Sequence, residues 1–548
     1  MKQYAFVILI LSVVQVFAQT QKPNILWIVC EDISPTLSMY GDNTAKTPTL
    51  DQLAKESTVY HNAFAPVGVC APTRSSIITG MYPTSIGTMN MRTGKDVMSW
   101  GARKYEAEIP ITDLEGNAIR QYSAVIPSEV KCFTEYLRAD GYYCTNNQKT
   151  DYQFAAPITA WDENNAKAHW RNTPKGMPFF SVFNIGITHE SQLWKQTGAL
   201  TVDPKTVPVP PYLQDTELAR NNIARHYSNV ELMDIEVGKL IKQLKADGLY
   251  DNTIIMFYSD HGGPLPRQKR AILDSGLKVP FMVKGLKNSE KGSTDRLISF
   301  TDLAPTILSL ANIKPPKYMD GEAFLGTYKV KPRKYIYGSS DRFDESTDRI
   351  RAIRNKRFLY LRNYFPEKIK YKEIGYRRNI PMMNELLELK EQQQLTEVQL
   401  DWFNTKTTEE LYDCEKDPHN LINLAQNPAY KELLNTFRKE NLNRIQQFPD
   451  LGLIPEAQLI DIMWPNFEQP TTNEVKVAEK AGTIQLKSST KGASIAYFLS
   501  DKPNLALDYN SNWKLYSKPL TVSKNTYIYT LAERIGYKES NIEMHQIK

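Results

Sequence analysis

The segment VGVCAPTRSSIITGMYPT, residues 67–84, places a thiol, a proline and a guanidinium at a spacing suited to anion chemistry. Cys70 and Arg74 are about one helical turn apart, and Pro72 is suited to the first position of a helix that SSIITGM continues. The N-terminus of a helix attracts negative charge. The segment therefore predicts an anionic substrate held beside a cysteine and an arginine.

Three apolar segments elsewhere in the chain are each followed directly by acidic residues or histidines. They are NILWIVCED (residues 24–32), MPFFSVFNIGITHES (177–191) and NTIIMFYSDHGG (252–263). Continuous apolar runs of this kind are typical of strands covered on both faces. Helical patterns lie between these segments, in TPTLDQLAKEST, SEVKCFTEYLRAD and ARHYSNVELMDIEVGKLIKQLKADG. The alternation predicts an α/β fold with a mostly parallel sheet, and the three polar ends are expected at one edge of that sheet.

The CAPTR motif and the SSIITGMYP that follows it resemble the modification signature of the type I sulfatases. The resemblance extends over residues 23–428 and implies an alkaline-phosphatase-like sheet flanked by helices. In this family the cysteine is oxidised before folding to formylglycine (3-oxoalanine), an aldehyde that is hydrated in the active site. The resemblance thus implies that Cys70 is the precursor of the nucleophile. It also implies a formylglycine-generating or sulfatase-maturating enzyme as a partner.

The same resemblance implies a Ca²⁺ site at the edge of the sheet. PNILWIVCED matches the strand that supplies two acidic ligands, here Glu31 and Asp32, and SDHGG matches a second pair, here Asp260 and His261. The modified Cys70 is the remaining ligand. Family members usually have Asp at the position of Glu31, and they have Asn or His at that of His261. Carboxylate oxygens form the hard site that Ca²⁺ prefers.

The catalytic cations and acid also follow from the resemblance. Lys149 in NNQKTDY and Lys269 in KRAILDSGLKVP match family lysines that act with Arg74 to offset charge on the sulfuryl oxygens. The position two residues after Lys149, usually histidine, is Asp151 in this chain. His189 in ITHES matches the histidine that ends the third strand, and we expect it to protonate the departing alcohol or amine.

Further segments resemble the sulfamidase-like branch, whose bacterial members act on sulfated polysaccharides such as glycosaminoglycans or algal ulvan. They include CTNNQKTDY, KAHWRN and DRFDESTDRIRAIRNKRFLYLRNYF. We therefore expect a carbohydrate sulfatase. His169, Trp170 and Arg171 in KAHWRN form either a sugar subsite or an ordinary packed loop. Two other functions fit the same motifs: a phosphodiesterase or phosphonate hydrolase of the same superfamily, and a glycan-binding protein whose Cys70 is never oxidised.

Charge and the first residues bear on partners and location. The chain of 548 residues has a formal charge of +6, and its basic residues are scattered, which argues against a nucleic-acid partner. Residues 1–18 are predicted to be a secretory signal peptide, with Lys2, an apolar run too short to span a bilayer, and VFA before the cleavage point. No other segment is apolar enough to span a membrane, so we expect a periplasmic or secreted protein.

Beyond the signal peptide, the sequence divides into three predicted parts. Residues 19–330 form the α/β catalytic domain, residues 331–465 a small α+β subdomain, and residues 466–548 a β-sandwich built from short alternating strands. Cys132 and Cys144 flank FTEYLRADGYY, which allows either a disulfide between them or two separate thiols.

Overall fold

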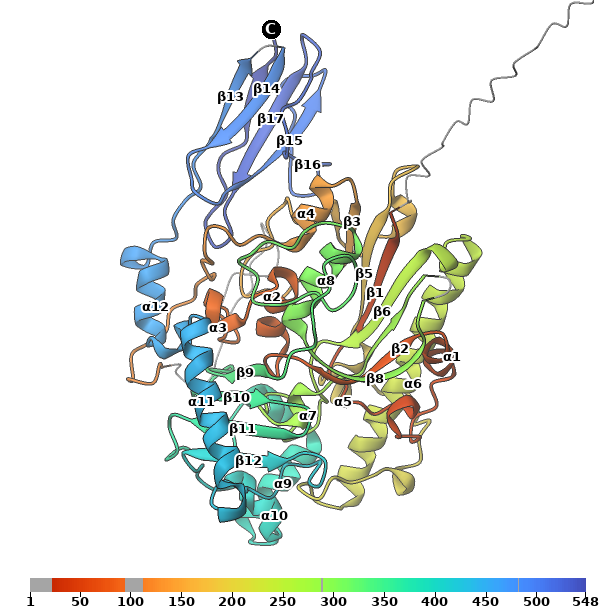
Figure 1. Cartoon of the computed structure of the whole chain (residues 1–548), viewed down its shortest axis with the longest axis vertical. Coiled ribbons are helices and arrows are strands. Elements are labelled where there is room, and N and C mark those ends of the chain that lie inside the picture. Colours follow the sequence, from red (N-terminus) through yellow and green to blue (C-terminus); the bar gives the residue numbers. More distant parts are fainter. Residues whose placement is uncertain (1–21, 94–111, 287–288, 481) are drawn as a thin grey trace, which may run out of the picture.

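The computed structural model describes residues 22–93, 112–286, 289–480 and 482–548 of the chain (Figure 1). The signal peptide predicted at residues 1–18 lies outside these ranges. None of the described helices combines the length and the hydropathy needed to cross a membrane.

The central sheet has eight strands in the order β4-β3-β5-β1-β6-β7-β2-β8. β1 pairs in parallel with both β5 and β6, whereas β7 runs antiparallel to its neighbours β6 and β2. The predicted α/β fold with a mostly parallel sheet is confirmed. The strands are β1 (Asn24–Cys30), β2 (Thr58–Phe64), β3 (Tyr143–Asn147), β4 (Glu163–Asn164), β5 (Phe179–Ile185), β6 (Thr253–Ser259), β7 (Phe281–Lys284) and β8 (Gly292–Ser299). The helices of this part are α1 (Pro48–Lys55), α2 (Cys70–Thr79), α3 (Pro83–Ile86), α4 (Phe133–Ala139), α5 (Gln192–Lys195), α6 (Glu217–Ala246), α7 (Asp274–Leu277) and α8 (Leu303–Leu310).

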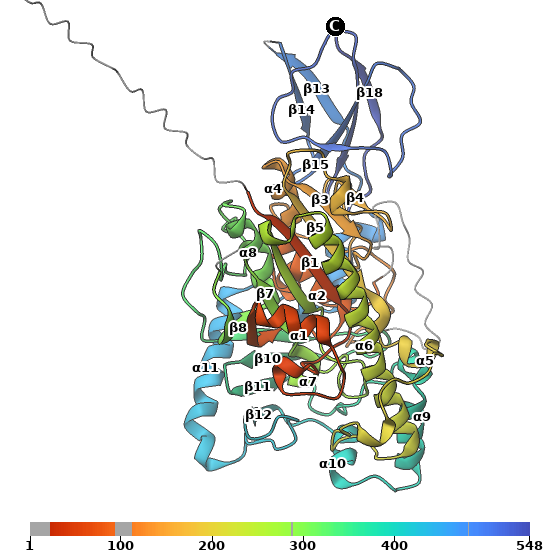
Figure 2. The same cartoon turned by 90° about the vertical axis from the view of Figure 1, so that its right-hand side faces the viewer.

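The continuous apolar sequence of β1 is explained by two hydrophobic cores, one on each face of the sheet. Ile25, Trp27 and Val29 pack into the core that includes residues of α2, α4 and α8. Leu26 and Ile28 pack into the core that includes residues of α1 and α6, and Figure 2 shows these two helices in front of the strands. Because successive side chains of a strand point to opposite faces, a strand covered on both sides needs an apolar residue at every position.

Two helices begin at residues other than those expected from the sequence. α6 begins at Glu217, ahead of the ARHY segment, because the Thr216 side chain caps it by accepting a hydrogen bond from the Ala219 N–H. α2 begins at Cys70, so Pro72 occupies the third helical position and not the first. The first N–H groups of a helix have no intrahelical acceptor, and the missing N–H of Pro72 therefore costs nothing there.

Two smaller parts built on antiparallel sheets follow the central sheet. The first sheet, β12-β11-β10-β9, is covered on one face by α11 and packs its other face against the central part. Beyond it, β13-β14 and β16-β15-β17-β18 share one apolar core, in agreement with the predicted sandwich. The strands are β9 (Ile336–Ser340), β10 (Ile350–Arg354), β11 (Phe358–Asn363), β12 (Glu409–Asp413), β13 (Val475–Lys480), β14 (Thr483–Ser488), β15 (Ser494–Ser500), β16 (Lys514–Leu515), β17 (Tyr527–Glu533) and β18 (Glu543–Gln546). The helices are α9 (Pro381–Glu391), α10 (Glu397–Leu400), α11 (Lys431–Gln447) and α12 (Glu456–Met463).

All five cysteines lie in the described part of the chain, and each is unbridged. Cys132 and Cys144 are buried, and burial raises the pKa of both thiols well above the ordinary value. Of the two alternatives left by the sequence, the structure therefore has two separate thiols.

The C-terminal sandwich docks on the central part beside α4 and β3 (Figure 1). The Lys131 ammonium donates to the carbonyl of Gly492 at 2.6 Å. The Arg138 guanidinium donates to the carbonyl of Trp513 at 3.1 Å. From the sandwich, a Glu533 carboxylate oxygen accepts the Ile158 N–H at 2.9 Å. These contacts fix the sandwich to the catalytic part by polar groups as well as by apolar packing.

The buried interface residue Glu533 predicts a pH-dependent stability. Burial raises the pKa of this carboxyl to about 8, and Glu539 and Glu135 add to the effect. Because the folded state then binds the proton more tightly than the unfolded chain, the free energy of unfolding falls as pH rises from about 4.5 to about 8. Glu533→Gln removes this pH dependence. In that pH range the free energy of unfolding of the variant, relative to that of the wild type, should therefore rise by up to about 1.4 kcal/mol per pH unit.

Urea unfolding of both proteins on either side of the window measures the difference. The matched control is Glu543→Gln, at an exposed position on β18. Its stability should follow that of the wild type at every pH. A Glu533→Gln variant with the same pH dependence as the wild type contradicts the prediction.

Candidate functional site

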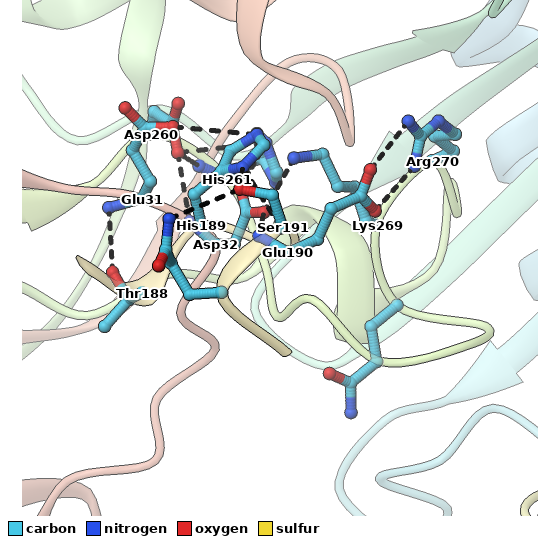
Figure 3. A network of polar contacts seen from close by, with 12 residues as sticks. Glu31, Asp32, Thr188, His189, Glu190, Ser191, Asp260, His261, Lys269 and Arg270 are labelled. Atoms are coloured by element: carbon cyan, nitrogen blue, oxygen red, sulfur yellow. Dashed lines mark hydrogen bonds and ion pairs between the residues drawn. The ribbon is translucent and has the colours of Figure 1, made fainter. Parts of the chain in front are cut away.

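The three strands whose polar ends were predicted to converge, β5, β1 and β6, are adjacent in the sheet. Asp32 and Asp260 follow β1 and β6, and the Asp32 N–H lies 3.3 Å from an Asp260 carboxylate oxygen. His189 follows the short 3-10 helix Gly186–Thr188 at the end of β5, and the next N–H, of Glu190, donates to Asp32 at 2.6 Å. Figure 3 shows these side chains around one centre. The expected convergence at the sheet edge is present.

Asp32 is the residue on which this cluster is centred. Its backbone has φ of 53°, in the left-handed region that few residues other than glycine adopt without strain. Its carboxylate is completely buried and accepts a hydrogen bond from the Lys269 ammonium at 2.6 Å. Although burial alone would raise the pKa of Asp32, the ammonium of Lys269 and the protonated imidazole of His261 hold that pKa well below its ordinary value. Asp32 is therefore an anion at neutral pH.

Within the described residues, two overlapping groups could hold a metal ion, and both include Asp32. One group adds Glu31 and His189, the other adds Asp260 and His261, and the ligand atoms of each group lie within 4.8 Å of one another. Asp32 Oδ1 and His261 Nε2 are 3.1 Å apart. Both atoms are buried and face each other, and no other described residue offers either of them a hydrogen bond of good geometry, as expected of atoms that coordinate a cation. These residues fit a divalent ion.

The orientation of His261 agrees with that role. Its Nδ1 donates to the Gly262 carbonyl at 3.0 Å, so Nε2 faces Asp32 Oδ1 and would bind a metal ion after losing its proton. Burial lowers the pKa of His261, but the carboxylates of Asp260 and Asp32 outweigh that effect and raise it to about 10. The imidazole thus lies in the most negative part of the site.

Cys70 is the first residue of α2 and is 1% exposed. Four cations lie close enough to its thiol to interact with it electrostatically: Arg74, Arg92, Lys149 and Lys269. A buried group surrounded by positive charge and placed at a helix N-terminus is suited to binding an anion. The structure therefore brings together the thiol and all three cations predicted from the sequence, and it adds Arg92.

The guanidinium of Arg74 is held on two sides. Its Nε donates to Asp260 at 3.1 Å, and its Nη1 donates to the side-chain oxygen of Asn184 at 2.8 Å. Its Nη2 is buried, has no hydrogen-bond partner in the part of the chain that the structure describes, and lies 3.7 Å from Glu31. Burial opposes the charge, but Asp260 and Glu31 raise the pKa of Arg74 above its ordinary value. One donor of a permanently charged group is thus left for a ligand.

Lys149 belongs to the same cluster, although its neighbourhood departs from the family motif. Its ammonium donates to Glu31 at 2.7 Å and lies 3.8 Å from Asp151, the residue that stands where histidine is usual. Asp151 also lies 3.7 Å from Arg92. Burial lowers the pKa of Lys149, but Glu31 more than compensates and raises it. Asp151 therefore links two cations and cannot replace the imidazole as a proton donor when ionised.

His189 is neutral at neutral pH in this structure. Burial and the charge of Lys269 lower its pKa to about 4, although Asp32 and Glu31 act in the opposite direction. Its Nδ1 accepts the Ser191 N–H at 3.2 Å, so in the neutral ring the hydrogen is on Nε2. That Nε2 lies 3.9 Å from Glu31, within the cluster. His189 can therefore donate a hydrogen bond from Nε2.

The structure also shows supporting residues that sequence reasoning missed. Arg270 donates two hydrogen bonds to Glu190, at 2.8 and 2.9 Å, and one to Asp344 at 2.9 Å, all among buried side chains. These contacts tie the segment after β5 to the segment that carries Lys269. Arg270 and Glu190 directly follow Lys269 and His189 in the sequence, but their pairing depends on the fold.

The KAHWRN segment forms a packed loop. Trp170 is 2% exposed, packs against Phe179 and Phe183, and donates from its indole nitrogen to Asp247 at 2.8 Å. Arg171 pairs with the same carboxylate at 2.7 Å. These side chains secure the C-terminal end of α6, which favours the packed-loop alternative over a sugar subsite.

Comparisons with known proteins agree with these features. Residues 23–313 match the family described as Sulfatase, and residues 267–401 match the family described as N-sulphoglucosamine sulphohydrolase, C-terminal. An "Ulvan-active sulfatase" of Formosa agariphila is 43% identical, with 95% of this chain and 90% of that protein covered. A solved 2-O GAG sulfatase has a TM-score of 0.54 at 18% identity, over 78% of this chain and 92% of the other. A phosphonate monoester hydrolase from Silicibacter pomeroyi has a TM-score of 0.55 at 14% identity, over 79% and 97%.

The buried pairs of Arg270 predict a large loss of stability when they are broken. Arg270→Met removes the guanidinium that pairs with the buried carboxylates of Glu190 and Asp344, and we expect the free energy of unfolding to fall by about 3–5 kcal/mol. The control is Arg171→Met, which removes an arginine–aspartate pair whose arginine side chain is 49% exposed. Urea unfolding should show little change for the control. An equal fall in the free energy of unfolding of the two variants would contradict the stabilising role assigned to the buried Arg270 pairs.

Proposed function

Because this chain belongs to the sulfatase family of sulfuric ester hydrolases, in its sulfamidase-like branch, we propose that it is a carbohydrate sulfatase acting on a sulfated polysaccharide. The observation that carries the proposal is the donor Nη2 of Arg74, which is buried inside a ring of cations at Cys70 and has no hydrogen-bond partner among the described residues. A sulfuryl group is the anion that this family binds in such a ring. The geometry thus supports recognition of a monoester sulfate.

The nucleophile in this proposal is Cys70 after oxidation to formylglycine by a maturating enzyme. When present, that group supplies a hydroxyl of a hydrated aldehyde for attack on sulfur. The position of residue 70, at the first turn of α2 and among four cations, favours the negative charge that develops there. The odd number of unbridged cysteines agrees with a thiol that serves as a precursor.

The metal in this proposal is Ca²⁺, held by Asp32, Asp260 and His261, with Glu31 at the side of the cluster next to Lys149. When bound, the ion would act as a Lewis acid that neutralises part of the charge on the nucleophile and on a sulfuryl oxygen. Asp32 Oδ1 and His261 Nε2, the two buried atoms without partners, are the first ligands we assign.

The other side chains of the cluster then have separate tasks. Arg74, Lys149 and Lys269 would orient the sulfate and offset the charge that spreads over its oxygens. His189, with its hydrogen on Nε2, would donate a hydrogen bond that stabilises negative charge on the oxygen or nitrogen that departs. Burial of the cluster excludes water from these charges, which strengthens each interaction.

The substrate class we propose is a sulfated polysaccharide or oligosaccharide of the ulvan or glycosaminoglycan type. The similarity to an ulvan-active sulfatase over nearly the whole chain supports ulvan first. We also propose that the protein is exported to the periplasm or secreted, because its first 18 residues have the features of a signal peptide.

The proposal predicts that Cys70 is required in its oxidised form. Protein matured in its host should show a loss of about 18 Da in the peptide containing Cys70 and should release sulfate from ulvan oligosaccharides. Cys70→Ala should abolish release. Cys414→Ala, which removes a partly exposed cysteine from the end of β12, should leave release unchanged.

Two results would each replace the proposal by one of its alternatives. Turnover of an aryl phosphodiester far above that of an aryl sulfate would indicate a phosphodiesterase or phosphonate hydrolase. An unmodified thiol, together with ulvan binding and no sulfate release, would indicate a glycan-binding protein.

The metal assignment predicts a stability change that is measurable without substrate. Saturating Ca²⁺ should raise the melting temperature of chelator-treated protein, since a ligand at about 100 times its Kd adds about 2.7 kcal/mol. Asp260→Asn should lose most of this increase. Asp295→Asn, at a carboxylate whose side chain is 73% exposed, should retain it. An identical melting temperature with chelator and with Ca²⁺ would count against an ion at this cluster.

A further inference from the structure

A line of hydrogen-bonded side-chain amides extends from Arg74 toward the C-terminal sandwich. Arg74 Nη1 donates to the side-chain oxygen of Asn184 at 2.8 Å. Asn184 donates from its amide nitrogen to Asn146 at 3.0 Å, and Asn146 donates in turn to Asn164 at 2.8 Å. Asn164 donates to the hydroxyl oxygen of Tyr509 at 2.9 Å. We call Asn184, Asn146, Asn164 and Tyr509 the amide chain.

The amide chain has one internally consistent direction. Each asparagine accepts through its oxygen from the side facing Arg74 and donates through its nitrogen toward Tyr509. A flip of Asn184 or of Asn146 would bring two donors together at one contact and two acceptors together at the other, and a flip of Asn164 would bring two donors together at its contact with Asn146. Hydrogen bonds aligned in one direction also polarise one another. The amide chain is therefore a defined arrangement and not a set of separate surface contacts.

The amide chain also fixes the backbone around the cations. Asn146 donates to the Lys149 carbonyl at 3.1 Å, and Asn184 donates to the Asn147 carbonyl at 3.1 Å. Asn184 and Asn146 lie on the adjacent strands β5 and β3. The same amides that contact Arg74 thus hold the turn that positions Lys149.

The Arg74 guanidinium is oriented by two hydrogen bonds, and the amide chain supplies the second of them. Asp260 holds Nε and Asn184 holds Nη1, and the guanidinium is planar, so these two contacts determine where Nη2 points. Nη2 is the donor left without a partner. A rotation permitted by the loss of Asn184 or of its support would move this donor away from a bound anion.

Tyr509 is held in place by the sandwich. It lies in the loop between β15 and β16, beside Trp513, which is 4% exposed and packs in a cluster with Ile158 of the central part. The Trp513 carbonyl accepts the Arg138 guanidinium at 3.1 Å. Tyr509 and Trp513 also line a cavity of about 320 Å³ between the sandwich and the central part. The outer end of the amide chain therefore belongs to the sandwich, and its inner end to the catalytic cluster.

We propose that the C-terminal sandwich is a positioning element of the catalytic site, in which Tyr509 orients Arg74 through Asn164, Asn146 and Asn184. The assignment of Arg74 to sulfate binding rests on the proposed function, whereas the orientation of its guanidinium does not. Tyr509 itself touches no reacting atom and acts through the amides.

The test is to remove the outer hydroxyl alone. Loss of one hydrogen bond corresponds to about 0.5–1.5 kcal/mol, so Tyr509→Phe should lower kcat for sulfate release by about 2- to 13-fold. Its melting temperature should stay close to that of the wild type. Asn164→Leu removes both the oxygen that faces Asn146 and the donor to Tyr509, and it should lower kcat at least as much. Tyr497→Phe removes a hydroxyl from β15 of the same sandwich, outside the amide chain, and should leave kcat unchanged.

A double-mutant cycle separates positioning from general stabilisation. Asn184→Ala cuts the inner end of the amide chain, so adding Tyr509→Phe to it should cause little further loss of kcat. Losses that multiply, or a Tyr509→Phe variant with the kcat of the wild type, overturn the inference while leaving the proposed function intact.

Crystal structures of the wild type and of Tyr509→Phe test the role of the amide chain without any measurement of turnover. If the wild type releases no sulfate, the proposed function fails, and the orientation of the Arg74 guanidinium in the two structures still tests the amide chain. A displaced guanidinium in the variant supports it, and an unchanged one overturns it.

Discussion

Burial of opposite charges in one small volume is the constraint on which the site depends. Asp32, Glu31 and Asp260 are almost completely buried, and each contacts a cation at 2.6–3.1 Å. Away from water such charges are tolerated only when partners satisfy them. Among the described residues, Asp32 Oδ1 and His261 Nε2 are available to bind a metal ion, and Arg74 Nη2 is available to bind an anion. The central sheet, α2 and the segments that follow β5 and β6 hold these charged side chains close together.

Much of the fold could be predicted because its signals are local. The apolar run of β1 reflects helices on both faces, and the same pattern in β5 and β6 placed three polar strand ends at one edge. The predicted cluster of Cys70, Arg74, Asp32 and Asp260 followed from that edge together with a recognisable motif. The first residues of helices are predicted less accurately than the strands, because a cap such as Thr216 depends on one side-chain contact that hydrophobic periodicity does not reveal.

The residues that sequence reasoning missed depend on pairing across the fold. Arg92 has no motif around it, yet it lies near Cys70 because the chain returns to the site there. Arg270 is separated from Asp344 by the strands β7, β8 and β9 and the helices α7 and α8, and Asn164 from Tyr509 by most of the chain. Spacing along a sequence carries no information about such contacts. The same limit explains why Cys132 and Cys144, close in the sequence, left the disulfide undecided.

The docked position of the sandwich has a consequence for biosynthesis. Cys70 and Arg74 are synthesised more than 400 residues before Tyr509. Domains generally fold in the order of their synthesis. The central sheet can therefore form before the tyrosine that completes the support of Arg74 has been made, and the guanidinium acquires its final geometry only after the sandwich has been synthesised and has docked.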